Sequence, residues 1–95
     1  MTRDEYKNEI LNVSVMFAAY LRKAMVSGWN PEGLKAYTDS KTVELAEITQ
    51  KAMEDDELDR LDYVVVSEWT YNMEAALDKA TEGICEFLEV TDELF

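Results

Sequence analysis

The stretch LDRLDYVVVSEWTYNMEAALDKATEGICEF, residues 58–87, decides the fold of this chain. Its apolar residues recur at positions 58, 61, 65, 69, 73, 76, 80, 84 and 87. The mean spacing is about 3.6 residues, which is the period of a straight α-helix. A strand over residues 62–71 is the competing interpretation, because β-branched and aromatic residues cluster there. The helical phase continues through that segment without a slip, so the pattern favours one long C-terminal helix.

A second helix is predicted at the N-terminus, where Thr2 and Glu5 have the spacing of a capping box. Apolar residues then follow in steps of four and three, at positions 6, 10, 13, 17, 20 and 24. We therefore expect a helix over about 3–26, ended by Gly28. Its middle, residues 13–21, is apolar nearly all round, which indicates burial against several helices or against a second copy of the chain. A homodimer through this helix is one of these alternatives.

Helix caps divide the middle of the chain. The pair NP at 30–31 predicts a short helix that ends near residue 37. The pair DS at 39–40 can cap another helix over 41–53, and one of the aspartates at 55–56 can cap the long helix. These elements predict one all-α domain over residues 1–95, a three- or four-helix bundle with a long acidic C-terminal helix. We expect the first helix to pack antiparallel to the last.

Composition limits the chemistry of the chain. It has 95 residues, no histidine and one cysteine, so a histidine-based triad and a typical Cys/His zinc site are excluded. The acids at 54–62 lack the spacing and the turn glycine of a calcium-binding loop. No catalytic constellation is recognisable, so we expect no enzyme activity, no cofactor and no metal.

Cellular location is predicted from the absence of two patterns. No apolar stretch approaches the roughly 20 residues that span a bilayer. The first residues, MTRDEYKNE, carry acids where a signal peptide has a basic start and an apolar run. We therefore expect a cytoplasmic protein that does not bind membranes.

The net charge of −12 is concentrated in the C-terminal part of the chain. Residues 1–28 hold four basic and three acidic side chains, and residues 29–53 hold three and four. Residues 54–95 hold two basic and fourteen acidic side chains, which gives −12 for this segment alone. Such a field repels nucleic acid and anionic membranes and attracts basic surfaces.

Six of these acids follow helical spacing, and we call them the acidic row: Glu74, Asp78, Glu82, Glu86, Glu89 and Glu93. Like charges three or four residues apart repel by about 0.2–0.5 kcal/mol per pair, and one lysine cannot offset five such pairs. The row is either a solvated face that keeps the protein soluble or a surface that binds a basic groove. Its charges are about 6 Å apart, whereas each DNA strand has one phosphate per roughly 3.4 Å.

A denser match to DNA requires a second group of acids, which we call the acidic cluster: Glu54, Asp55, Asp56, Glu57, Asp59 and Asp62. In size and in this uneven placement of acids on long helices, the chain resembles phage-encoded DNA-mimic inhibitors of the anti-restriction and anti-CRISPR type. The resemblance covers charge pattern and length and includes no sequence motif. It implies an inhibitor in the host cytoplasm whose row and cluster bind the nucleic-acid site of a nuclease or of a CRISPR or restriction effector.

Two other interpretations stay open at this point. Nuclease immunity proteins use similar physics, and charge pattern does not separate them from DNA mimics. Alternatively, the chain is a structural or assembly protein that forms homo-oligomers, with the acids serving only solubility. In neither case does the chain bind nucleic acid directly.

A weaker resemblance concerns DSKTVELAEI at 39–48, which is similar to the region of acyl carrier proteins where phosphopantetheine is attached to a serine. Here the stretch is one residue shorter, and the long C-terminal helix does not fit that family. Ser40 is therefore expected to be a plain helix cap without a cofactor.

Overall fold

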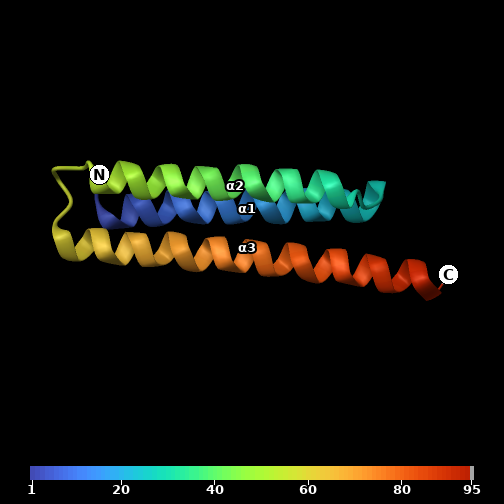
Figure 1. Ribbon diagram of the computed structural model, residues 1–95. Helices are drawn as coiled ribbons and strands as arrows, with labels where there is room; N and C mark the ends of the chain where they lie inside the picture. The colour runs from blue at the N-terminus through green and yellow to red at the C-terminus, as the bar shows by residue number, and fades with distance from the viewer. Residues whose placement is uncertain (95) are drawn as a thin grey trace.

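The computed structural model describes residues 1–94 and contains three α-helices, α1 (Arg3–Ser27), α2 (Pro31–Met53) and α3 (Arg60–Leu94). Figure 1 shows α1 and α3 running in one direction and α2 in the other. The described residues contain no strand, and segment 62–71 is helical throughout. The prediction of an all-α bundle with a long acidic C-terminal helix is confirmed.

α1 lies parallel to α3, so the antiparallel packing expected for this pair is wrong. The ammonium group of Met1 lies 3.0 Å from the carboxylate of Asp55, close to the start of α3. Near the other end, Met25 of α1 and Phe87 of α3 line the same pocket. Short loops explain this order, because each loop joins two antiparallel neighbours and the first and third helices then run the same way.

The ends of α1 form as predicted. The Thr2 hydroxyl accepts a hydrogen bond from the backbone N–H of Glu5 at 3.2 Å, and the Glu5 carboxylate accepts one from the N–H of Thr2 at 2.9 Å. Gly28 follows the last turn with φ 101°, a backbone conformation that glycine adopts without steric cost. A capping box and a glycine therefore fix both ends of α1.

The start of α3 differs from the prediction that an aspartate at 55–56 caps it. Asp59 Oδ1 accepts the backbone N–H of Asp62 at 2.7 Å, which places the cap later in the chain. Asp55 is engaged elsewhere and accepts the hydroxyl of Tyr6 at 2.6 Å. The acids at 54–57 therefore belong to the turn that precedes α3.

α2 is one continuous helix, so the predicted break between residues 37 and 41 is wrong. Its buried positions keep helical spacing throughout: Leu34, Thr38, Lys41, Leu45, Ile48 and Ala52. Two of these, Thr38 and Lys41, are polar, so the pattern of apolar residues in the sequence did not show that the buried face is continuous. Ser40 is exposed in the middle of the helix and caps nothing.

The buried face of α3 is also rotated from the predicted one by about one residue, or roughly 100°. Its buried residues are Val66, Thr70, Leu77 and Thr81. Two members of the predicted apolar stripe, Leu61 and Phe87, are 72% and 65% exposed. Five other members are half-buried and pack against the core, so the stripe forms the edge of the core beside α1: Leu58, Trp69, Met73, Ala80 and Ile84.

Two threonine pairs explain how polar residues occupy this core. The hydroxyls of Thr38 and Thr81 are 2.7 Å apart, and those of Thr49 and Thr70 are 2.6 Å apart. Each pair joins α2 to α3 and gives a buried hydroxyl a hydrogen-bond partner, which removes most of the penalty for burying it. The pairs share one antiparallel register, so they also align the two helices.

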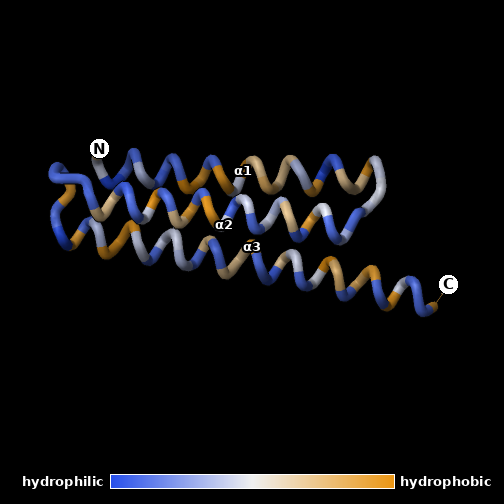
Figure 2. The backbone as a smooth tube through the Cα atoms, turned by 45° about the horizontal axis from the view of Figure 1, so that its top comes forward, coloured by the Kyte–Doolittle hydropathy of each residue, from blue (hydrophilic) through white to orange (hydrophobic). Residues whose placement is uncertain are grey.

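The bundle is elongated, with extents of 55 × 19 × 16 Å. In Figures 1 and 2 the C-terminal end of α3 projects beyond the turn between α1 and α2. Thr38 lies opposite Thr81 and Thr49 lies opposite Thr70. Continuing this antiparallel register places Pro31, the first residue of α2, opposite roughly residue 88 of α3. Residues 89–94 therefore have no neighbouring helix, and we call them the overhang.

The expectation that no segment could span a membrane needs correction. Among residues 1–94, α1 is long and apolar enough to cross a bilayer by length and composition alone. A core helix of a water-soluble bundle and a signal sequence pass the same test. In this fold α1 contributes Tyr6, Ile10, Val13 and Phe17 to the core, which accounts for part of its apolar character.

Candidate functional site

The acidic row lies along the C-terminal half of α3, the orange-to-red part of the helix in Figure 1. Asp78, Glu82, Glu86, Glu89 and Glu93 are exposed, and Glu74 is half-buried. Between its first and last members the row extends about 28 Å, at 1.5 Å per residue. None of its carboxylates takes part in the ion pairs found within residues 1–94. The row is thus a line of charge that no cation of the described fold neutralises by direct contact.

Two further acids extend the row, and sequence reasoning missed them. Counted at about 100° per residue, Glu68 and Asp92 fall within the arc that the row occupies on α3. Both are exposed. The same angular count applied to the sequence would have found them, so the signal was present.

The acidic cluster behaves differently, because several of its members hold the fold together. Asp55 Oδ2 accepts the Tyr6 hydroxyl at 2.6 Å and lies 3.0 Å from the N-terminal ammonium. Glu57 Oε2 lies 2.9 Å from the same ammonium. These contacts tie the start of α1 to the turn before α3.

The pKa values of these groups shift in the directions that the contacts require. The Tyr6 hydroxyl and the N-terminal ammonium hold the pKa of Asp55 at about 2, below its ordinary value of 3.8. Burial, and then the hydrogen bond to Asp55, raise the pKa of the Tyr6 hydroxyl. Hydrogen bonds to Glu57 and Asp55 raise the pKa of the N-terminal ammonium. The network therefore favours the charged forms of Asp55 and of the terminus.

Three other members of the cluster also have partners. The Arg3 guanidinium lies 3.5 Å from Asp62. Asp59 caps α3 through the N–H of Asp62, and the Gln50 amide donates to Glu54 at 2.8 Å. Asp56 is exposed. The cluster is therefore engaged in local contacts, unlike the row.

The row lies in the C-terminal half of α3, whereas the cluster lies at the start of α3 and in the turn before it. About 12 residues of helix, or roughly 18 Å, separate Asp62 from Glu74, and Glu68 lies between them. The two groups therefore do not form one dense array with the spacing of DNA phosphates. Among residues 1–94, no group of three or more histidine, cysteine or acidic side chains is placed to hold a metal ion.

Comparisons of the chain with protein-family models, curated proteins and solved structures found no match. The function is therefore inferred from the surface of this fold.

The contacts of Asp55 give a testable pH dependence. Because its pKa is lowered on folding, the contribution of Asp55 to stability is fully present above pH 3.8 and is lost as the pH falls through about 2. We expect Asp55→Asn to lower the melting temperature at neutral pH, and we expect its difference from the parent protein to close between these two values. Thermal unfolding followed by circular dichroism over this range measures the difference. Asp56→Asn is the control, with little effect at any pH, and a constant difference for Asp55→Asn would contradict the assignment.

Proposed function

We propose that this protein is a non-enzymatic inhibitor that binds the basic groove of a nucleic-acid-binding protein and excludes its DNA or RNA. The partner class is a nuclease or a CRISPR or restriction effector, met in the cytoplasm of a host cell. The observation that carries this proposal is the exposed acidic row, which has no ion-pair partner within the described fold.

The physical basis of binding is the rigidity and charge of α3. A helix holds the backbone positions of its acids at fixed spacing, so no backbone ordering is needed when cationic residues bind the carboxylates in a line, and the cost is limited to the side chains. The mutual repulsion of neighbouring acids is relieved when a cationic surface approaches, which favours the complex over the free protein. Complementary potentials also speed the encounter of the two proteins, and this effect weakens as salt rises.

The contacts within the acidic cluster determine which of the predicted site residues are available to bind a partner. The row, extended by Glu68 and Asp92, makes the main contact in this proposal. Of the cluster, exposed Asp56 is the member best placed to add to the row, since Asp55 and Asp62 are engaged with the N-terminus and Arg3. One helix edge with charges about 6 Å apart fits a row of basic side chains better than it copies a phosphate strand.

The test compares two variants that carry the same change in net charge. In the row variant, Glu74, Asp78, Glu82 and Glu86 become their amides. In the control variant, four exposed acids outside α3 become theirs: Asp4, Glu32, Asp39 and Glu47. Each protein, immobilised, is used to capture proteins from bacterial lysate at about 0.05 M and at about 1 M salt, where screening differs strongly.

We expect the parent and control proteins to capture one or more basic nucleic-acid-binding proteins at low salt only. The row variant should lose them while staying folded, since removing like charges at helical spacing does not destabilise α3. The captured protein should release a fluorescent duplex or single strand when the parent protein is added. If the row variant keeps every partner, or if the captured protein keeps its nucleic acid, the inhibitor proposal is wrong.

A further inference from the structure

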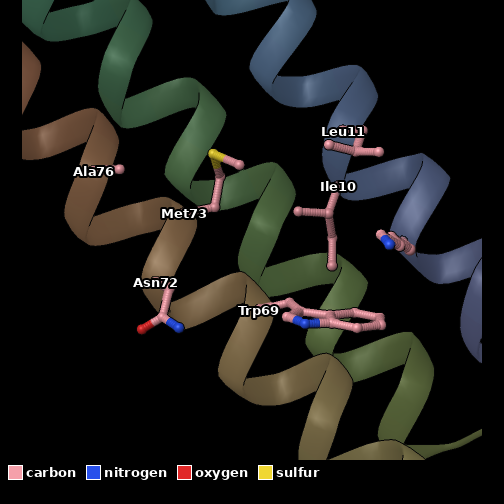
Figure 3. Close-up of a pocket in the computed structure, with 7 residues that line it drawn as sticks. Ile10, Leu11, Trp69, Asn72, Met73 and Ala76 are labelled. Atoms are coloured by element: carbon pink, nitrogen blue, oxygen red, sulfur yellow. The ribbon is translucent and has the colours of Figure 1, made fainter.

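The side of the bundle between α1 and α3 carries an apolar surface, which we call the α1–α3 face: Leu11, Trp69, Met73, Ala76, Ala80 and Phe87. Figure 3 shows one end of it, where the Trp69 ring lies beside Ile10 of α1 and Asn72 points away; Met73 lines the same hollow. A hollow of about 260 Å³ lies there with an almost wholly apolar lining, and the Lys7 ammonium lies 5.8 Å from the Trp69 ring. A second hollow, lined in part by Ala80 and Phe87, continues the face along α3.

The chain covers this face only in part, since Trp69, Met73 and Ala80 are half-buried against the core while Leu11 is 47% exposed. Phe87 is 65% exposed, and in the overhang Val90 is 49% and Leu94 73% exposed. A Cβ atom added at Gly83 would meet no atom within 4 Å, so packing inside the chain does not require this glycine. Large apolar side chains on a helix end without neighbours are typical of a surface that packs against another molecule.

The accessible surface indicates how much area such a contact could bury. The chain exposes 6629 Å², whereas a compact monomer of its mass exposes about 5,600 Å². Its radius of gyration is 15.8 Å, against about 12 Å for a compact chain of this length. The excess of about 1,000 Å² matches the roughly 800 Å² that each partner buries in a standard protein interface.

We propose that the occupant of the α1–α3 face is a second copy of this chain, with the two α3 helices antiparallel and crossing near Ala80. In this arrangement Phe87 and Val90 of one copy lie over Met73 and Trp69 of the other, so the C-terminal end of each α3 fills the hollow of its partner. The small residues at 76, 80 and 83 let the two helices approach closely at the crossing. The contact is isologous, so one surface accounts for both partners.

Charge also favours this occupant over an unrelated apolar helix. Next to Phe87, the acid Glu86 borders the apolar surface that each copy contributes, and the face that would receive it carries Lys7 and Lys79 at its edges. Apart from Glu86, the members of the acidic row lie on another side of α3, so dimerisation leaves them exposed. Repulsion between two chains of charge −12 opposes association and is screened by salt.

This dimer does not rest on the inhibitor proposal, and salt separates the two. Self-association should strengthen as salt rises, whereas binding of a basic partner should weaken. A result that contradicts the dimer proposal would therefore not contradict the inhibitor proposal, and the reverse also holds.

The test is sedimentation velocity over a range of protein concentrations at low and high salt, with the parent protein and two matched variants. Gly83→Glu puts a charge at the crossing, where no atom of the chain lies within 4 Å of the added Cβ and where glutamate suits a helix better than glycine. Ala75→Glu makes the same charge change on the exposed acidic side of α3. We expect Gly83→Glu to weaken the dimer at least about tenfold and Ala75→Glu to change it little.

Cross-linking tests the register separately. In a Cys85→Ala background, Ala80→Cys should oxidise to a covalent dimer, because only residues near the two-fold axis meet their own copies. Ala75→Cys in the same background should form no covalent dimer, because its position faces away from the contact. A parent protein that is monomeric at every concentration and salt, or a dimer that survives Gly83→Glu, would overturn the proposal.

Discussion

Replacing Leu45 with alanine is expected to lower the free energy of unfolding by about 2–5 kcal/mol. Leu45 has no exposed surface and lies in the middle of α2 within the main core cluster. Removing its branched end loses the transfer free energy of the buried carbons and leaves a cavity that the three helices fill only in part. No other single change considered for this chain should have a larger effect.

A matched control lies two residues away. Val43 is on the same helix and is 56% exposed, so Val43→Ala should change stability by less than about 0.5 kcal/mol. Urea unfolding followed by circular dichroism measures both, and the slope of each transition shows whether the unfolded state has changed. Equal effects of the two substitutions would mean that α2 does not bury the face described.

The helix starts and ends that depend on local chemistry could be predicted from sequence. The Thr2 and Glu5 capping box and the stop at Gly28 each involve residues within a few positions of each other, so their spacing alone carries the signal. The continuity of α2 and the buried face of α3 could not be predicted in this way. The Thr38 hydroxyl donates to the Leu34 carbonyl of its own helix, whereas the buried Thr81 hydroxyl finds its partner in Thr38, a pairing that exists only after α2 and α3 have met.

The same distinction separates the acidic row from the acidic cluster. The exposure of the row follows from helical phase, which is a local property of the sequence. The engagement of Asp55 could not be foreseen, since its partners are Tyr6 and the N-terminal ammonium, about fifty residues earlier in the chain. Charge composition gives the net charge of a segment, but it does not show which of its acidic side chains will form ion pairs or hydrogen bonds in the folded protein.

The second large effect is expected at Lys41, a lysine in a core position of α2 with only 5% exposure. Its ammonium lies 2.8 Å from Glu44 Oε2 and 5.1 Å from the centre of the Tyr37 ring. Pairing with Glu44 raises the pKa of Lys41 against the opposing effect of burial, so the side chain stays charged. Replacing a whole buried ion pair with apolar side chains is often neutral or stabilising, and here replacing Lys41 alone approaches that case because the Glu44 side chain is 45% exposed.

Lys41→Met and Glu44→Gln should therefore change stability in opposite directions. Methionine fills the same space without desolvating a charge, and Glu44, whose side chain is 45% exposed, then returns to water. We expect a gain of about 1 kcal/mol, at the low end of the range for buried pairs, because one partner is already half solvated. Glu44→Gln instead leaves the buried ammonium without its carboxylate and should cost about 1–3 kcal/mol.

Urea unfolding of both variants and of the double variant completes a double-mutant cycle for this pair. In the double variant most of the loss from Glu44→Gln should disappear, because no buried charge is left to stabilise. If Lys41→Met lowers stability as much as Glu44→Gln does, the ammonium contributes net stability to the core. The ion pair and its contact with Tyr37 would then be a favourable part of the α2 packing, and the desolvation cost assigned to Lys41 would be wrong.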